Sequence, residues 1–203
     1  QVQGDYCVAA LPLPLLAEVD TDFADDFKAT VAKVPYAAAG KMGIQFKRRF
    51  WEEDEHIYGG VSYTDLPIGT IGYPSHGYHS GGKGVLLGGC VGGSYSSRMP
   101  SSAPADRVRE ALAQGRRIHP QYDQEFDGGV AVAWHRVPGA MGCFAQWTDE
   151  LRERHYDALT AFDGRIVLAG EHASWLPAWQ EGAITSALDA IERLHARAHA
   201  AGA

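Results

Sequence analysis

The chain is poor in cysteine and has no long apolar run. Its 203 residues include three cysteines, Cys7, Cys90 and Cys143, with no C-x-x-C pair among them. An odd number this small excludes a disulfide scaffold. Cys7 and Cys143 stand among apolar neighbours, and we expect both to be small buried side chains. No eighteen consecutive residues are apolar, so the sequence predicts no membrane-spanning helix.

Positive charge is also in deficit. The chain has 18 Lys and Arg against 25 Asp and Glu, a net charge of −7. Because phosphate binding needs clustered Lys and Arg, this balance argues against nucleic acid and against an anionic membrane as partners. The 45% apolar share with 24 Gly and 10 Pro is typical of one large or two small globular domains.

The sequence begins at Gln1 with no signal-peptide pattern, and we expect a processed subunit or part of a longer protein. The compartment stays open between cytoplasmic and exported. No G-x-G-x-x-G occurs, so the chain carries no dinucleotide fingerprint of its own. His76 and His79 lie in a Gly-rich turn without a third ligand at metal-binding spacing, so we expect no metal site.

Hydrophobic periodicity predicts a mixed α/β or α+β fold. Helices are expected at 22–34, 104–114, 148–159 and 180–195. Strands are expected at 5–10, 41–46, 85–87, 130–137 and 165–169, with turns and short strands in 59–80 and an acidic turn at 52–55. In 41–46 the apolar residues alternate, which predicts a half-buried strand. In 180–195 one apolar stripe is expected, formed by Ala183, Ile184, Ala187, Leu188, Ile191 and Leu194.

The stretch from Gly164 to Leu188 holds the most chemical information. A buried strand ends at Gly170, Glu171 follows, and an aromatic loop leads to a helix that begins near Gln180. A carboxylate at a strand end can accept hydrogen bonds from sugar or ribityl hydroxyls, and a helix N-terminus attracts an anion or an electron-rich carbonyl. Two tryptophans in the loop suit the walls of a flat apolar slot. A plain strand–loop–helix core unit is the alternative on chemistry alone.

The order strand, G-E, loop, W-x-E-G-A, helix resembles the C-terminal FAD-binding signature of the flavin amine oxidase family, which includes L-amino-acid oxidases and monoamine oxidases. Other segments resemble the family in the same order. Residues 4–12 resemble the strand that returns to the FAD domain, and residues 41–54 the lysine-bearing strand with its Phe-Trp turn. Residues 60–76 resemble L-amino-acid oxidases in particular, and residues 134–144 the lining of the substrate cavity.

The resemblance implies the C-terminal part of a two-domain FAD-dependent amine oxidase. That part comprises a mixed-sheet substrate domain and the closing strand and helix of a Rossmann-like FAD-binding domain. We expect an FAD-domain strand at 1–16, a substrate-binding domain at 17–147 and a return to the FAD-binding domain at 148–203. In the family the Gly-rich fingerprint lies at the N-terminus. The implied partner is therefore an N-terminal FAD-binding chain of the same enzyme, and we expect an oligomer.

The resemblance also implies cofactor contacts. Glu171 would bind the ribityl or ribose hydroxyls of FAD. Gln180 and Glu181 open the helix aimed at the pyrimidine edge of the flavin, and Trp51 of the Phe-Trp turn is a further cofactor contact. Lys41 matches the catalytic lysine that holds a water near flavin N5.

Substrate contacts follow from the same resemblance. Trp179 would be one wall of an aromatic cage beside the ring, and the Ala178 carbonyl would receive the substrate amine. Phe144 and Trp134 would line the side-chain pocket, although core roles fit them equally well. L-amino-acid oxidases usually carry a tyrosine that binds the substrate carboxylate, and that position here falls on Gly89 or Cys90, neither of which is a phenol.

These residues predict an FAD-dependent L-amino-acid oxidase that consumes an L-amino acid and molecular oxygen. The products would be a 2-oxo acid, ammonia and hydrogen peroxide. The missing tyrosine keeps a monoamine or polyamine oxidase of the same fold open. A structural or regulatory chain without catalysis is the alternative from another class.

Overall fold

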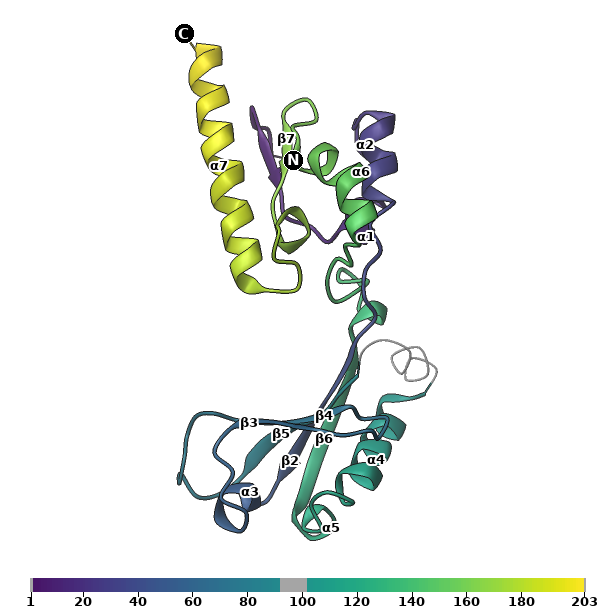
Figure 1. Cartoon of the computed structure of the whole chain (residues 1–203), viewed down its shortest axis with the longest axis vertical. Helices are drawn as coiled ribbons and strands as arrows, with labels where there is room; N and C mark the ends of the chain where they lie inside the picture. The colour runs from purple at the N-terminus through teal and green to yellow at the C-terminus, as the bar shows by residue number, and fades with distance from the viewer. Residues whose placement is uncertain (1, 92–101, 203) are drawn as a thin grey trace. The chain divides into compact units, whose positions relative to one another are not determined.

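The computed structural model describes residues 2–91 and 102–202, which form two compact units (Figure 1). One unit, here called the sheet unit, spans Ala38–Val137. The other, the layered unit, combines Gln1–Ala37 with Pro138–Ala203. The boundaries expected at 16/17 and 147/148 differ from these, because helix α2 (Asp25–Val31) packs with helix α6 (Asp149–Thr160) in one apolar core.

The sheet unit contains five antiparallel strands. Their spatial order is β3-β4-β5-β2-β6, with bounds β2 Gly40–Phe46, β3 Gly60–Tyr63, β4 Thr70–Tyr73, β5 Gly84–Val91 and β6 Phe126–Ala133. The alternation expected in the central strand is confirmed, since Met42, Ile44 and Phe46 are fully buried on one face. Residues of β2 on the other face, beginning with Lys41, are exposed or half-buried.

Within 38–91 and 102–137 the sheet unit has three α-helices: α3 Phe50–Glu53, α4 Pro104–Gly115 and α5 Tyr122–Glu125. Helix α4 begins at Pro104. Proline suits this position because it has no backbone N–H, and the N–H groups of a helix's first turn have no partner within the helix. The opposite face of the sheet stays open: Val85 is 51% exposed and Val130 is 62% exposed. An antiparallel sheet tolerates this arrangement because only one of its faces must be buried.

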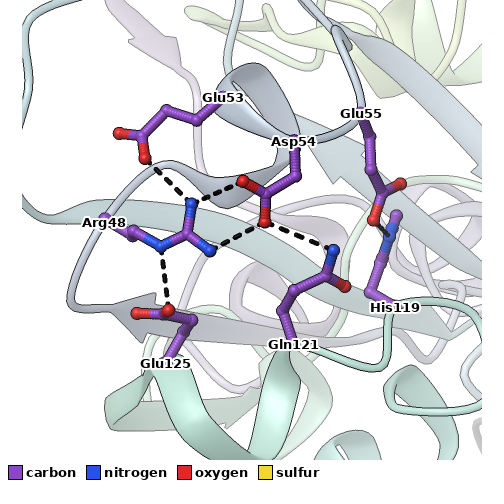
Figure 2. A network of polar contacts seen from close by, with 7 residues as sticks. All are labelled: Arg48, Glu53, Asp54, Glu55, His119, Gln121 and Glu125. Carbon is purple, nitrogen blue, oxygen red and sulfur yellow. Dashed lines mark hydrogen bonds and ion pairs between the residues drawn. The ribbon is translucent and has the colours of Figure 1, made fainter.

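The expected acidic turn at 52–55 is instead partly helix α3, and its charges form two kinds of contact. Glu52 is buried beside Arg49 and accepts a hydrogen bond from Arg49 Nε at 2.7 Å. Arg48 lies nearer the surface, where it binds Glu53, Asp54 and Glu125 (Figure 2). The Arg48 guanidinium lowers the pKa of Asp54. The Arg48 network connects the end of β2 with α3 and α5.

The layered unit is built on two parallel strands, β1 (Cys7–Ala9) and β7 (Ile166–Leu168). Helix α7 (Gln180–Gly202) packs on one face, where Val167 and Ala190 are buried. Helix α1 (Leu13–Leu16), α2 and α6 cover the other face, where Leu168 is buried. The described residues also include the 3-10 turns η3 (Trp134–Arg136) in the sheet unit and η4 (Glu171–Ala173) in the layered unit.

The expected position of one strand and the expected burial of two cysteines are wrong. Strand β6 covers 126–133 instead of 130–137, because Gly128 and Gly129 pair with β2 and the chain turns at Trp134. Gly129 fits there because a Cβ would lie 2.8 Å from Val108 Cγ1. Cys7 and Cys143 are exposed rather than buried, since Cys7 opens a strand that is itself only half-buried.

The apolar stripe expected on helix α7 is only partly covered, since Ala187 and Leu194 pack against buried residues of the unit. The buried positions of the helix are small, Gly182, Ser186 and Ala190, while Ile184, Leu188 and Ile191 are 53–66% exposed. Among residues 2–91 and 102–202, no helix has the length and apolar character needed to cross a membrane.

The buried pair in α3 yields a stability prediction. Glu52→Gln removes the negative charge beside Arg49, which leaves a buried cation without its counter-ion, and we expect a loss of about 3 kcal/mol in the free energy of unfolding. Glu53→Gln, the exposed control in the same helix, should lose less than about 1 kcal/mol. Urea unfolding of both variants measures the difference.

The same pair predicts a pH dependence. The Arg49 guanidinium lowers the pKa of Glu52 in the folded state, so the pair stabilises the protein above the ordinary glutamate pKa and this stability is lost as the pH falls. The free energy of unfolding, measured from neutral to acidic pH, should therefore depend less on pH for Glu52→Gln than for wild type. The same pH dependence in both proteins would contradict the role of this pair.

Candidate functional site

The loop between β7 and α7 is held by hydrogen bonds to its main chain. At its start, Ser186 Oγ of α7 accepts from Gly170 N at 2.9 Å, and the same hydroxyl lies 2.8 Å from Gly170 O. Gly170 has φ +133°, a conformation that side chains rarely adopt, and a Cβ there would lie 2.6 Å from the His172 ring. The glycine before Glu171 is therefore required by the backbone.

Residues of α6 and the segment before it donate to three successive carbonyls of the loop. Trp147 Nε1 donates to His172 O at 3.0 Å, Tyr156 Oη to Ala173 O at 3.2 Å and Arg152 Nη1 to Ser174 O at 3.1 Å. Since buried main-chain groups need partners, these three side chains fix the course of the loop.

Arg152 also stabilises the exposed ring of Trp175. Its guanidinium carbon lies 4.5 Å from the Trp175 ring centre, 5.0 Å from that of Tyr156 and 5.3 Å from that of Trp147. Such cation–π contacts contribute about 0.5–1 kcal/mol each at exposed sites. The Trp175 side chain, 70% exposed, is thereby held in one position on the loop.

Glu171 lies near the start of the loop and accepts hydrogen bonds from main-chain N–H groups with both carboxylate oxygens. Oε1 accepts from Ala145 N at 2.9 Å, and Oε2 accepts from Ala178 N at 2.8 Å. Ala178 has φ +69°, which is uncommon for a residue with a Cβ. The next residue, Trp179, is 70% exposed, and Gln180 begins α7.

The first turn of α7 approaches the loop closely at Gly182. A Cβ at this position would lie 2.0 Å from the carbonyl oxygen of Leu176, so only glycine fits. This contact explains the glycine of the W-x-E-G-A pattern physically. The N-terminus of this 23-residue helix carries partial positive charge and directly follows Trp179, which is 70% exposed.

His172, next to Glu171, is a buried neutral imidazole. Its Nδ1 lies 3.1 Å from Tyr36 Oη, and burial lowers the pKa of His172 to about 4. Its Nε2 is buried and has no hydrogen-bond partner within the described part of the chain. Burial, and to a smaller extent the Glu171 carboxylate, raises the pKa of Tyr36, which stays protonated.

In the sheet unit, Lys41 is exposed on the open face of the sheet. It is paired with Cys90 on β5 and with Val132 on β6. Gly89 is paired with buried Met42, and a Cβ at Gly89 would lie 2.1 Å from Met42 Cε. Of the two candidate positions for the missing tyrosine, only Cys90 therefore pairs with Lys41.

The remaining predicted residues have different surroundings. Trp51 is fully buried in the core of the sheet unit against Phe46 and Phe50, so its ring has no exposed surface for the cofactor contact expected of it. Trp134 is 38% exposed, and Phe144 in the layered unit is half-buried. Their roles in binding stay predictions.

The structure brings Glu171, Ala178, Trp179, Gln180 and Glu181 together on one loop and helix start of the layered unit, and it pairs Lys41 with Cys90 in the sheet unit. Sequence reasoning missed six residues that hold the loop: Tyr36, Trp147, Arg152, Tyr156, His172 and Ser186. The i, i+4 spacing of Arg152 and Tyr156 was an available signal for a shared helix face. The residues 2–91 and 102–202 contain no cluster of His, Cys, Asp or Glu able to hold a metal.

Comparison with known proteins shows which family this chain resembles. The family described as flavin containing amine oxidoreductase matches residues 1–195. A putative L-amino-acid oxidase, YobN, of Bacillus subtilis (strain 168) is 30% identical over 190 residues, which cover 91% of this chain and 40% of the relative. An L-amino-acid oxidase of Siganus canaliculatus is 33% identical over 80% of this chain and 31% of its own length.

Solved structures share the fold. Cyclohexylamine oxidase from Brevibacterium oxydans IH-35A superposes with a TM-score of 0.75 at 19% identity, over 94% of this chain and 43% of that chain. Putrescine oxidase bound to putrescine gives a TM-score of 0.77 at 14% identity, over 94% and 42%. The expected mixed α/β fold is confirmed. The chain spans 40% of the length of the Bacillus subtilis relative and 31% of that of the Siganus canaliculatus relative.

Removal of the Ser186 hydroxyl tests how the loop is held. Ser186→Ala leaves the Gly170 N–H without its acceptor, and we expect a loss of about 1–3 kcal/mol in the free energy of unfolding. Thr185→Ala, the exposed neighbour on the same helix, should change it by less than about 0.5 kcal/mol. Urea unfolding of the two variants provides the measurement, and equal stabilities would show that Gly170 finds another partner.

Proposed function

The chain belongs to the flavin-containing amine oxidoreductase family, and we propose that it is the C-terminal portion or a subunit of an FAD-dependent L-amino-acid oxidase. The expected flavin cofactor and the oxidoreductase class agree with that membership. The observation that carries the proposal is the loop at Glu171, where the exposed Trp179 directly precedes the N-terminus of α7.

These residues fit the ring end of a flavin. Trp175 and Trp179 are each 70% exposed although they are large apolar side chains, as expected for residues that receive a planar ligand. The N–H groups of the first turn of α7 suit the carbonyl oxygens of the pyrimidine edge and stabilise negative charge there. Glu171 has further lone pairs with which its oxygens can accept ribityl or ribose hydroxyls.

Two features support further polypeptide as the partner. In the described residues, β1 and β7 pair only with each other, whereas parallel sheets are normally larger and covered. The exposed stripe of Ile184, Leu188 and Ile191 on α7 also needs a cover. We assign this cover to the N-terminal FAD-binding portion of the same enzyme, which would supply the Gly-rich phosphate site.

A bound flavin would supply the redox chemistry, as the acceptor of a hydride from the substrate Cα–H and as the group that molecular oxygen reoxidises to give hydrogen peroxide. In the proposal the Ala178 carbonyl orients the substrate amine, and Trp179 walls the slot and excludes water. Lys41 would hold a water molecule and transfer a proton to or from it. Hydrolysis of the imine product would give a 2-oxo acid and ammonia.

A plain amine oxidase is the second candidate. It is favoured by the pairing of Cys90, rather than a tyrosine, with Lys41. It is also favoured by the fold shared with cyclohexylamine and putrescine oxidases. A structural or regulatory chain without catalysis is the third candidate.

The test is a peroxide assay. The chain is produced together with the N-terminal portion, and peroxide release is measured with L-amino acids and with plain amines. We expect a yellow protein that releases peroxide with L-amino acids. Release with amines alone would favour the second candidate, and bound flavin without release the third. A protein that binds no flavin would contradict the proposal.

Lys41 provides a prediction for the proposed chemistry. Lys41→Met should keep the flavin absorbance and lower the rate of peroxide release by about 10²–10⁴-fold, the range for a proton-transfer group. Lys47→Met is the matched control, because Lys47 is also an exposed lysine and follows the same strand. Equal rates in the two variants would remove Lys41 from the proposed machinery.

A further inference from the structure

Glu171 connects two segments that are far apart in the sequence. Its oxygens accept from Ala145 N, 26 residues earlier, and from Ala178 N, 7 residues later. A hydrogen bond from an N–H to a charged carboxylate is roughly twice as strong as one between neutral groups. The single carboxylate thus fixes both segments against each other.

On one side the connection reaches a rigid support. Tyr36 and Ala145 form a β-bridge, in which Ala37 N donates to Phe144 O at 2.8 Å and Gln146 N to Pro35 O at 2.8 Å. Ala145 is 1% exposed and belongs to the apolar core with Leu159 and Leu168. The Ala145 N–H is therefore a fixed point.

On the other side the connection reaches a residue in an unfavourable conformation. For a residue with a Cβ, φ +69° is disfavoured relative to right-handed geometry, and such a residue persists only where its surroundings hold it. The Glu171 oxygen holds the N–H of that residue, Ala178. Trp179 and the first turn of α7 follow directly, so their position depends on this conformation.

From this geometry we infer that Glu171 is a positioning residue: by bonding Ala145 and Ala178 it sets where Trp179 and the first turn of α7 stand. The inference rests on the proposed function for its consequence, which is that the flavin pocket keeps its shape through Glu171 in addition to any contact with flavin hydroxyls. Tyr36 and His172 pack beside the carboxylate and complete a buried polar support.

The test uses Glu171→Gln in the assembled protein. A glutamine has one acceptor oxygen and places an NH₂ group against the second N–H, so it can satisfy only one of the two amides. We expect amide hydrogen exchange at Ala178 or Ala145, measured by NMR, to become at least tenfold faster, and flavin affinity to fall at least tenfold. Glu153→Gln, an exposed glutamate on α6, is the matched control and should change neither.

A second substitution separates positioning from direct contact. Glycine adopts φ +69° without penalty, so Ala178→Gly added to Glu171→Gln should restore most of the flavin affinity. Affinity lost equally with and without Ala178→Gly, or unchanged exchange at both amides in Glu171→Gln, would overturn the inference. If Glu171→Gln does not fold, Glu171→Asp, whose shorter side chain cannot span both amides, takes its place with the same criteria.

The two proposals fail separately. A wild-type protein that binds no flavin contradicts the proposed function, and amide exchange at Ala145 and Ala178 then decides the positioning role alone. A protein that binds flavin but shows unchanged exchange in Glu171→Gln contradicts only the positioning role.

Discussion

The candidate site depends on the hydrogen bonding of one loop, residues 170–179. A loop that displays large aromatic rings has few apolar contacts of its own, so its backbone polar groups must be fixed by other means. Ser186, Trp147, Tyr156 and Arg152 bind its first half, and Glu171 binds its second half to Ala145. Trp175 and Trp179 are exposed, and these hydrogen bonds hold the main chain that carries them.

The two units use different physical solutions around their predicted chemistry. The sheet unit buries one face of an antiparallel sheet and leaves Lys41 on the open face among apolar residues such as Val85 and Val130. The layered unit has two parallel strands between helices, and its exposed stripe on α7 suits contact with further polypeptide. Both features are expected of a chain that spans 31–40% of the length of two curated relatives.

Strong periodicity predicted most elements, and weak periodicity predicted them poorly. The alternation of Met42, Ile44 and Phe46 located β2, and Pro104 with Gly115 located α4, because each pattern is local. Strand β6 was misplaced because its first half contains Gly128 and Gly129, which pair with β2, and close packing of Gly129 against Val108 and Ile44 requires glycine at that position. The stripe on α7 is mostly exposed because burial of that helix is achieved by small residues on a neighbouring side.

The sequence by itself determined the family resemblance of the candidate site. The order G-E, aromatic loop, W-x-E-G-A is a local pattern, and its glycines and charged residues can be identified without the tertiary structure. The sequence also determined that Lys41 lies on the outward face of its strand. Only the tertiary structure decided that Glu171 bonds Ala145, that Arg152 supports Trp175 and that Trp51 is a core residue. Those contacts join residues distant in the chain, and their existence depends on how the elements pack rather than on any local preference.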